Sequence, residues 1–144
     1  MAHYLDTSAL VKLVVAETET AALRDWLVRR DRVLVASDLE RTELQRAVRR
    51  AAPDRALQAR AVLDSLTLTS LTAPVFESAA RIDPTGLRSL DAIHLAAALD
   101  LGDDLEGLVT YDDRLADAAR TNGVVVIAPG VEWAPRGSNP QPTD

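Results

Sequence analysis

Four acidic side chains fall at positions where strand-like and helix-like segments of this sequence meet. Asp6 ends a short apolar stretch near the N-terminus, and Asp112 ends a second such stretch near residue 110. Glu43 and Asp91 lie early in segments whose apolar spacing indicates helices. If the strands are parallel, all four carboxylates lie at one edge of the sheet, because the carboxyl ends of the strands and the helices that follow them meet there.

Such a group of carboxylates indicates a site for a divalent cation. Two like charges about 4 Å apart repel by about 1 kcal/mol in water and by about 4 kcal/mol at an effective dielectric constant of 20. A hard cation removes this penalty, and all-oxygen ligation in a chain without Cys favours Mg²⁺ or Mn²⁺ over zinc. We expect Asp6 and Asp91 to be the main ligands, Asp112 to assist, and Glu43 to orient water or a second metal ion. The chemistry that this arrangement suits is phosphodiester hydrolysis.

Each of these acids also has a purely structural interpretation. Asp6 and Asp112 precede helices and could serve only as their N-caps. Asp91 could stabilise the positive end of its own helix, although a carboxylate facing inward among Leu and Ala is costly unless it is paired or metal-bound. Glu43 could pair with Arg46 one turn further along, and position alone leaves both interpretations open.

Other polar residues near these acids are expected to have structural roles. Ser37 and Glu40 have the spacing of a capping box, in which a hydroxyl and a carboxylate each satisfy a free N–H at the helix start. His94 is expected to be a hydrogen-bonded helix residue without a catalytic role, and His3 to be solvent-exposed. Asp113 is expected to cap its helix or to pair with the arginine that follows it.

Strand-like and helix-like segments alternate along the whole chain. Strands are expected at residues 3–5, 32–36, 66–71, 107–110 and 124–127. Helices are expected at 9–15 (with Thr7 or Ser8 as the cap), 17–30, 38–52, 54–63, 74–81, 90–101 and 113–121. Because the strands are short, apolar and separated by helices, the sequence predicts an α/β fold with a parallel sheet covered by helices on both faces.

Composition limits the class of protein. A chain of 144 residues indicates one domain, which we place at residues 1–133, with a polar, Pro-rich tail at 134–144 that is expected to be disordered. No apolar stretch approaches the roughly 20 residues of a membrane helix, so no membrane association is expected. The absence of Cys fits a reducing compartment such as the cytoplasm.

The positive charge is almost entirely arginine, since Lys12 is the one lysine of the chain. A net charge of −6 argues against a broad, non-specific nucleic-acid binder. Arginine suits bidentate contacts with phosphates or carboxylates, although clusters on helices are commonly solvated faces. The two clusters are Arg29-Arg30-Arg32 and Arg46-Arg49-Arg50.

Four sequence blocks, taken in order, resemble the PIN-domain ribonucleases, and among them the VapC toxins of bacterial and archaeal toxin–antitoxin pairs. Each block alone is common, but together they extend over residues 3 to about 130. The blocks are YLDTSALVK at 4–12, SDLERTELQRA at 37–47, LDAIHLAAA at 90–98 and VTYDDRL at 109–115.

The resemblance implies a three-layer sandwich, with a five-stranded parallel sheet between helices, and endoribonuclease activity that depends on Mg²⁺ or Mn²⁺. It places the acids of the family on the four carboxylates described above, with Thr7 or Ser8 and Thr110 as supporting polar groups. It favours Glu43 over Glu40 for the acid of the second block. Whether Asp113 also touches a second metal ion stays open.

The resemblance also implies partners. Family members form homodimers, cut structured RNA such as tRNA or rRNA and thereby inhibit translation. They are silenced by a cognate antitoxin whose C-terminal segment covers the acidic site, and an acidic pocket attracts the basic side chain that such a segment inserts.

Two other functions are alternatives to the nuclease. A phosphatase with Asp6 as its nucleophile would want a second Asp two residues on, where Ser8 stands, and a downstream lysine, which is absent after Lys12. A catalytically inactive PIN-like module would bind RNA or a partner without cleaving it. The presence of all four acids argues against that loss of activity.

Overall fold

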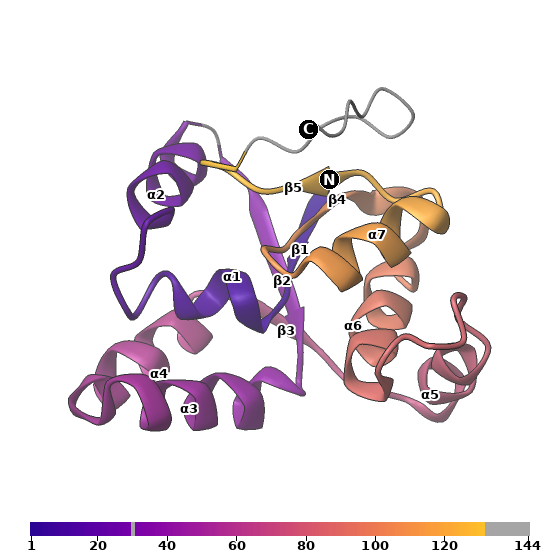
Figure 1. The fold of residues 1–144 in the computed structure, drawn as a ribbon, viewed down its shortest axis with the longest axis horizontal. Helices are drawn as coiled ribbons and strands as arrows, with labels where there is room; N and C mark the ends of the chain where they lie inside the picture. Colours follow the sequence, from indigo (N-terminus) through magenta and orange to yellow (C-terminus); the bar gives the residue numbers. More distant parts are fainter. Residues whose placement is uncertain (30, 132–144) are drawn as a thin grey trace, which may run out of the picture.

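The computed structural model describes residues 1–29 and 31–131, and within them the chain forms a sheet between two groups of helices (Figure 1). The strands are β1 (Ala2–Leu5), β2 (Val33–Ser37), β3 (Thr67–Thr69), β4 (Leu105–Val109) and β5 (Val126–Ile127). The α-helices are α1 (Thr7–Val11), α2 (Thr20–Val28), α3 (Glu40–Ala51), α4 (Ala56–Asp64), α5 (Ala73–Ala80), α6 (Ser89–Leu99) and α7 (Asp113–Thr121), with 3₁₀ turns η1 (Pro53–Arg55) and η2 (Gly102–Asp104).

The five strands pair in the order β3-β2-β1-β4-β5, and every neighbouring pair is parallel. The expected α/β fold with a five-stranded parallel sheet is therefore confirmed. The chain builds the sheet outward from β1 through β2 to β3, and then returns to add β4 and β5 on the other side of β1. The carboxyl ends of β1 and β4 thus adjoin where the winding reverses, the place at which open parallel sheets bind ligands.

Side chains that alternate along the strands supply two separate cores. Tyr4 and Leu108 pack into one core with buried residues of α5, α6 and α7, whereas their successors Leu5 and Val109 pack into the other with α1, α2, α3 and α4. Figure 1 shows the same division, with α1 to α4 on one side of the sheet and α5 to α7 on the other. Because both faces are covered, the central strands β1, β2 and β4 are mostly apolar, as expected of a parallel sheet.

Several element boundaries differ from those expected. The first helix begins at Thr7, two residues early, and ends at Val11, whereas the second is trimmed to Thr20–Val28. The strand expected at 107–110 begins at Leu105, where it pairs with Ala2 of β1. Gly123, with φ of +78°, follows the last helix and ends it in the left-handed conformation that glycine adopts readily.

The tail at 134–144, expected to be disordered, lies outside the described residues, so the domain boundary at 133 stays a prediction. None of the described helices has both the length and the apolarity needed to span a bilayer.

Candidate active site

Asp6 is fixed at the junction of β1 and α1. It is the N-cap of α1: its Oδ1 accepts the backbone N–H of Ala9 at 3.2 Å and the hydroxyl of Ser8 at 2.7 Å. Its Oδ2 accepts the hydroxyl of Thr110 from beyond the end of β4 at 2.8 Å. The expectation that Thr7 or Ser8 caps the helix was wrong. The helix begins at Thr7, and the carboxylate of Asp6, the residue before it, accepts the Ala9 N–H. Burial raises the pKa of Asp6, and the hydrogen bond from Ser8 and the charge of His94 oppose that rise.

Thr110 and Ser8 tie the ends of β1 and β4 together. Besides its bond to Asp6, the Thr110 hydroxyl accepts the backbone N–H of Asp112 at 3.1 Å. The Ser8 hydroxyl accepts the backbone N–H of Tyr111 at 2.8 Å. Thr110 is fully buried, and its hydroxyl also lies 3.3 Å from the hydroxyl of Ser8. These bonds fix the orientation of the Asp6 carboxylate and the path of the chain into Asp112.

Asp112 and Asp91 act on each other across the same edge. Asp112 is the N-cap of α7, and its Oδ1 accepts the N–H groups of Arg114 and Leu115 at 2.9 and 3.0 Å. Asp91 lies in the first turn of α6. Burial raises the pKa of Asp91 first, and the negative charge of Asp112 raises it further, against the effect of His94. The capping interpretation thus holds for Asp6 and Asp112, and the cap expected at Asp113 is supplied by Asp112 instead.

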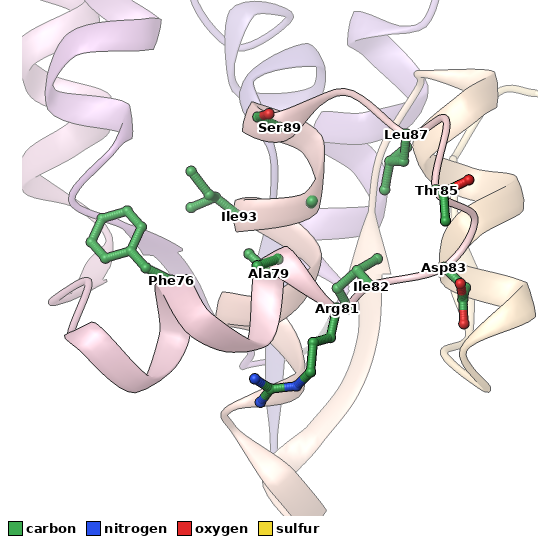
Figure 2. Close-up of a pocket in the computed structure, with 11 residues that line it drawn as sticks. Phe76, Ala79, Arg81, Ile82, Asp83, Thr85, Leu87, Ser89 and Ile93 are labelled. Carbon is green, nitrogen blue, oxygen red and sulfur yellow. The ribbon is translucent and has the colours of Figure 1, made fainter.

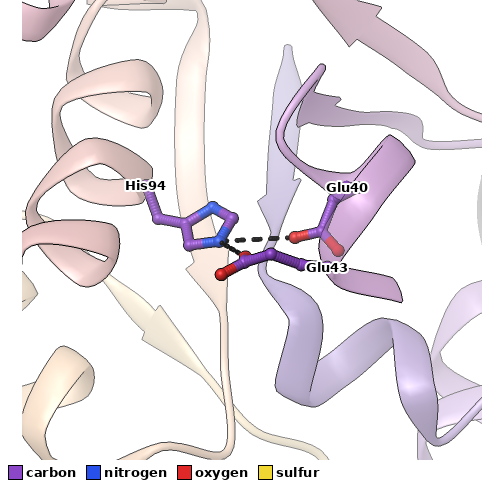
Figure 3. Close-up of side chains that lie close together, drawn as sticks. All are labelled: Glu40, Glu43 and His94. Carbon is purple, nitrogen blue, oxygen red and sulfur yellow. Dashed lines mark hydrogen bonds and ion pairs between the residues drawn. The ribbon is translucent and has the colours of Figure 1, made fainter. Parts of the chain in front are cut away.

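Glu43 is held by two donors from other elements. Its Oε1 lies 2.8 Å from the Thr7 hydroxyl and 2.6 Å from Nε2 of His94 (Figure 3). The other ring nitrogen of His94 lies 2.9 Å from the hydroxyl of Tyr4. Burial works to raise the pKa of Glu43, but the hydrogen bond and charge of His94 outweigh it, so the pKa is lowered. Among the described ion pairs, the alternative pairing of Glu43 with Arg46 does not occur.

Glu40 belongs to the acid cluster, and its expected role in a capping box was wrong. The N-cap of α3 is Leu39. The Ser37 hydroxyl accepts the Leu39 N–H at 3.3 Å, in place of the Glu40 N–H that a capping box requires. Glu40 is instead fully buried, with Oε2 at 3.4 Å from Nε2 of His94 (Figure 3). Burial raises the pKa of Glu40 to about 7, although His94 and Thr7 oppose the rise.

The protonation of this group follows from counting hydrogens. The single hydroxyl hydrogen of Thr7 cannot serve two carboxylates, yet its oxygen lies 2.7 Å from Glu40 and 2.8 Å from Glu43. When Glu40, whose pKa is raised to about 7, carries a proton, its carboxyl donates to Thr7, which then donates to an ionised Glu43. Burial works to lower the pKa of His94, but Glu43, Glu40 and Asp6 outweigh that effect. The pKa of His94 is therefore raised, which favours the charged imidazolium.

His94 is the shared neighbour of the acids, as Glu43, Glu40, Asp6 and Asp91 all respond to its charge. The expectation that His94 is a hydrogen-bonded helix residue is met, but its partner Glu43 is an acid of the candidate site. Its position one turn after Asp91 was the signal in the sequence, since residues three apart share a helix face. Glu40 likewise precedes Glu43 by three residues, so these two side chains also share a helix face.

His3, expected to be solvent-exposed, is buried. Its ring packs against the edge of Trp26, with the ring centroids 5.0 Å apart, and only 4% of the residue is exposed. Ala2 and Tyr4 pack on one face of β1 and Leu5 on the other. The sequence of β1 does not reveal that Trp26 of α2 covers His3. His3 lies away from the carboxyl end of β1, so it takes no part in the acid site.

The donor set fits a divalent cation. Ligand atoms of Glu40, Glu43 and His94 all lie within 4.8 Å of one another. In the described part of the chain, Asp6, Asp91 and Asp112 do not form a group this tight, although Asp91 and Asp112 repel each other. Carboxylate oxygens suit Mg²⁺ or Mn²⁺, and the imidazole of His94 would join them as a ligand only after losing the proton that its raised pKa favours.

A separate hollow of about 420 Å³ lies against α5, the start of α6 and the loop between them (Figure 2). Apolar side chains, including Phe76, Ile82 and Ile93, line much of it. Among its described lining residues the one carboxylate is Asp83, so no member of the acid cluster reaches it. The hollow therefore has no part in the candidate chemistry.

Comparison with known proteins decides the family. The model of the PIN domain family matches residues 3–121. The chain belongs to the PIN-domain family. This PIN-domain chain is 46% identical over 131 residues to Ribonuclease VapC47 of Mycobacterium tuberculosis, an alignment that covers 88% of the chain and 96% of the relative. It is 47% identical over 128 residues to Ribonuclease VapC46 of the same species, covering 89% of the chain and 98% of the relative.

Solved structures show the same fold. The crystal structure of Mycobacterium tuberculosis VapC20, described as a Sarcin-Ricin loop cleaving toxin, aligns with a TM-score of 0.73 at 18% identity, over 89% of this PIN-domain chain and 100% of that one. A chain of a toxin–antitoxin complex from Klebsiella pneumoniae aligns with a TM-score of 0.63 at 19% identity, over 81% and 90%. The PIN-like three-layer architecture and the family resemblance are thereby confirmed.

Proposed function

We propose that this PIN-domain protein is a cytoplasmic endoribonuclease that depends on Mg²⁺ or Mn²⁺ and acts as the toxin of a toxin–antitoxin pair. Its substrates would be RNAs of the tRNA or rRNA class, whose cleavage inhibits translation. The observation that carries the proposal is the position of Asp6 and Asp112 after the adjoining strands β1 and β4, with acids of α3 and α6 near His94. The ribonuclease names of the relatives support the same activity.

Asp6, Asp91 and Asp112 are the residues that would hold the cation. Asp6 is buried with a raised pKa, and Asp91 is close enough to Asp112 to be destabilised by its charge, so both gain from a positive neighbour. The chemistry supplied by bound Mg²⁺ or Mn²⁺ is activation of water and neutralisation of charge on the phosphodiester.

Glu43 would orient the attacking water and receive its proton. In the described structure both of its hydrogen bonds fall on Oε1, which leaves Oε2 for a further partner. Its lowered pKa keeps it ionised near neutral pH, and its side chain is 20% exposed, enough to meet water. Thr7 and His94 orient Glu43, while Ser8 and Thr110 orient Asp6. This is the division of work that general-base catalysis requires.

The partners proposed for this protein are RNA, a cognate antitoxin and a second copy of the chain. An acidic site attracts a basic side chain of an antitoxin, and one structural neighbour is described as part of a toxin–antitoxin complex. Exposed Phe76, on α5, supplies apolar surface for a homodimer.

The test is RNA cleavage by purified protein with Mg²⁺ or Mn²⁺, with and without chelator, alongside the D6A variant. We expect cleavage that chelator abolishes and that D6A lacks. Cleavage that survives both would come from a contaminant or another site. RNA binding without cleavage, under conditions where the protein is folded and metal is present, would favour the inactive binding module and contradict the proposed activity.

A further inference from the structure

A groove of about 360 Å³ leads from the acid site along α3. Thr7 and Glu43 line one end of it, and Arg46 and Arg50 line it further along the helix. Leu90, half-exposed at the start of α6, forms part of the opposite wall. The groove therefore joins the proposed catalytic carboxylate to two positive charges through a partly apolar passage.

The helical register places these side chains in a row. Glu43, Arg46 and Arg50 are separated by three and four residues, so they share one face of α3. With a rise of 1.5 Å per residue, Arg46 lies about 4.5 Å and Arg50 about 10.5 Å beyond Glu43 along the helix axis. Arg49, between them in sequence, is exposed but does not line the groove.

The two groove arginines have no partner within the described structure. Arg29 and Arg41 form ion pairs with acids on their own segments, whereas neither Arg46 nor Arg50 forms one among the described residues. Glu43, the nearest acid along the helix, accepts its bonds from Thr7 and His94 instead. Both guanidinium groups are exposed and free to bind an anion from solution.

An RNA strand is the anion that this row fits. If the scissile phosphodiester lies at the acids, as the proposed function requires, the neighbouring phosphates of the same strand extend from that point. A planar guanidinium binds phosphate bidentately, and the two arginines supply local positive charge on a chain whose net charge is −6. Leu90 provides apolar surface for sugar or base.

We infer that Arg46 and Arg50 bind backbone phosphates of the RNA substrate on one side of the cleavage site. This inference rests on the proposed function for the identity of the ligand. It assigns the arginine cluster of α3 to substrate positioning, with Arg46 and Arg50 inside the groove and Arg49 outside it.

The experiment measures RNA affinity without cleavage. Binding of a random-sequence, single-stranded RNA oligonucleotide to the D6N protein is titrated at several KCl concentrations, with and without R46Q plus R50Q. We expect the double substitution to weaken binding about tenfold or more. We also expect the slope of log K against log salt to become shallower by about 1.4, since each phosphate contact on a single strand contributes about 0.7. R46K plus R50K, which keeps the charge, should retain most of the slope.

The matched control is R49Q, which removes the same charge from the same helix outside the groove. We expect it to change affinity less than twofold and to leave the salt slope within about 0.3 of the D6N value. Equal effects of R49Q and the groove substitutions would overturn the inference, because they would show only a general effect of net charge. Circular dichroism of each variant checks that α3 is still folded.

The outcome is separable from that of the proposed function. If wild-type protein cleaves RNA but the groove variants bind and cleave like R49Q, this inference fails and the nuclease stands. If no RNA is cleaved under any metal condition, the proposed function fails whatever the affinities are. Groove variants that keep RNA affinity but escape inhibition by the antitoxin would assign the groove to a protein partner and contradict the inference.

Discussion

Replacing Glu40 with glutamine should stabilise the metal-free protein at alkaline pH. Burial raises the pKa of Glu40 from 4.5 to about 7. This value already includes the opposing effects of His94 and Thr7, which lower the pKa. Since one pKa unit corresponds to 1.36 kcal/mol, ionising this carboxyl in the folded protein costs about 3 kcal/mol more than in the unfolded chain. The E40Q variant has a similar shape and never ionises, so it avoids this cost.

The sign of the pH dependence follows from the direction of the pKa. A carboxyl with a raised folded-state pKa binds its proton more tightly in the folded state, so stability falls as pH rises. The wild-type protein should lose about 3 kcal/mol through Glu40 between about pH 4.5 and about pH 7, with little further loss above that range. The E40Q variant should lack this component. The two proteins should therefore have similar stability near about pH 4, and E40Q should be more stable by up to about 3 kcal/mol at about pH 8.

The assay is urea unfolding of both proteins across this pH range in the presence of chelator, which keeps metal binding from adding its own stabilisation. E77Q makes the same chemical change on an exposed position of α5 and should shift the free energy of unfolding by less than about 0.5 kcal/mol at either pH. An E40Q protein that is less stable than wild type at about pH 8 would refute the reasoning. It would show that Glu40 acts mainly as the ionised partner of His94 and that burial does not dominate.

Three further predictions concern the other acids. D91N should raise the melting temperature in chelator by about 3–5 °C, because it removes repulsion from Asp112 on the order of 1 kcal/mol; a lower melting temperature would count against the clustering. T110V should lower the free energy of unfolding by about 1–3 kcal/mol, since it removes the donor to Oδ2 of Asp6 and leaves the Asp112 N–H without its side-chain acceptor, whereas T110S should stay close to wild type by the same measurement. E43Q should lower kcat for RNA cleavage by about 10²–10⁴-fold with a smaller effect on KM, and an unchanged kcat would remove Glu43 from the mechanism.

Local patterns in the sequence predicted the frame of the site. Asp6 and Asp112 follow apolar strands and precede helices, so the parallel sheet alone brings them to adjoining strand ends. The interpretation of both acids as helix N-caps was also confirmed. A carboxylate that caps through one oxygen keeps its second oxygen for another ligand. For Asp112 the capping bonds from Arg114 and Leu115 both fall on Oδ1.

Contacts between distant segments escaped prediction. Glu40 meets His94 from a different helix, and nothing in the spacing around Ser37 shows which way the first turn of α3 faces. Local chemistry favoured a capping box, but the turn places Leu39 at the cap position and turns Glu40 inward. His3 was misjudged for the same reason, since its burial depends on Trp26 of α2.

Direct measurement of Mn²⁺ binding tests most directly whether the separated acids share a cation. Isothermal titration of Mn²⁺ into wild-type, D6N and D91N proteins gives the affinity and stoichiometry without any RNA. E77Q serves as the control for loss of one surface charge. We expect D6N and D91N each to weaken Mn²⁺ binding at least tenfold, and E77Q to bind Mn²⁺ like wild type. Wild-type affinity in both D6N and D91N would contradict the shared site and, with it, the proposed nuclease centre.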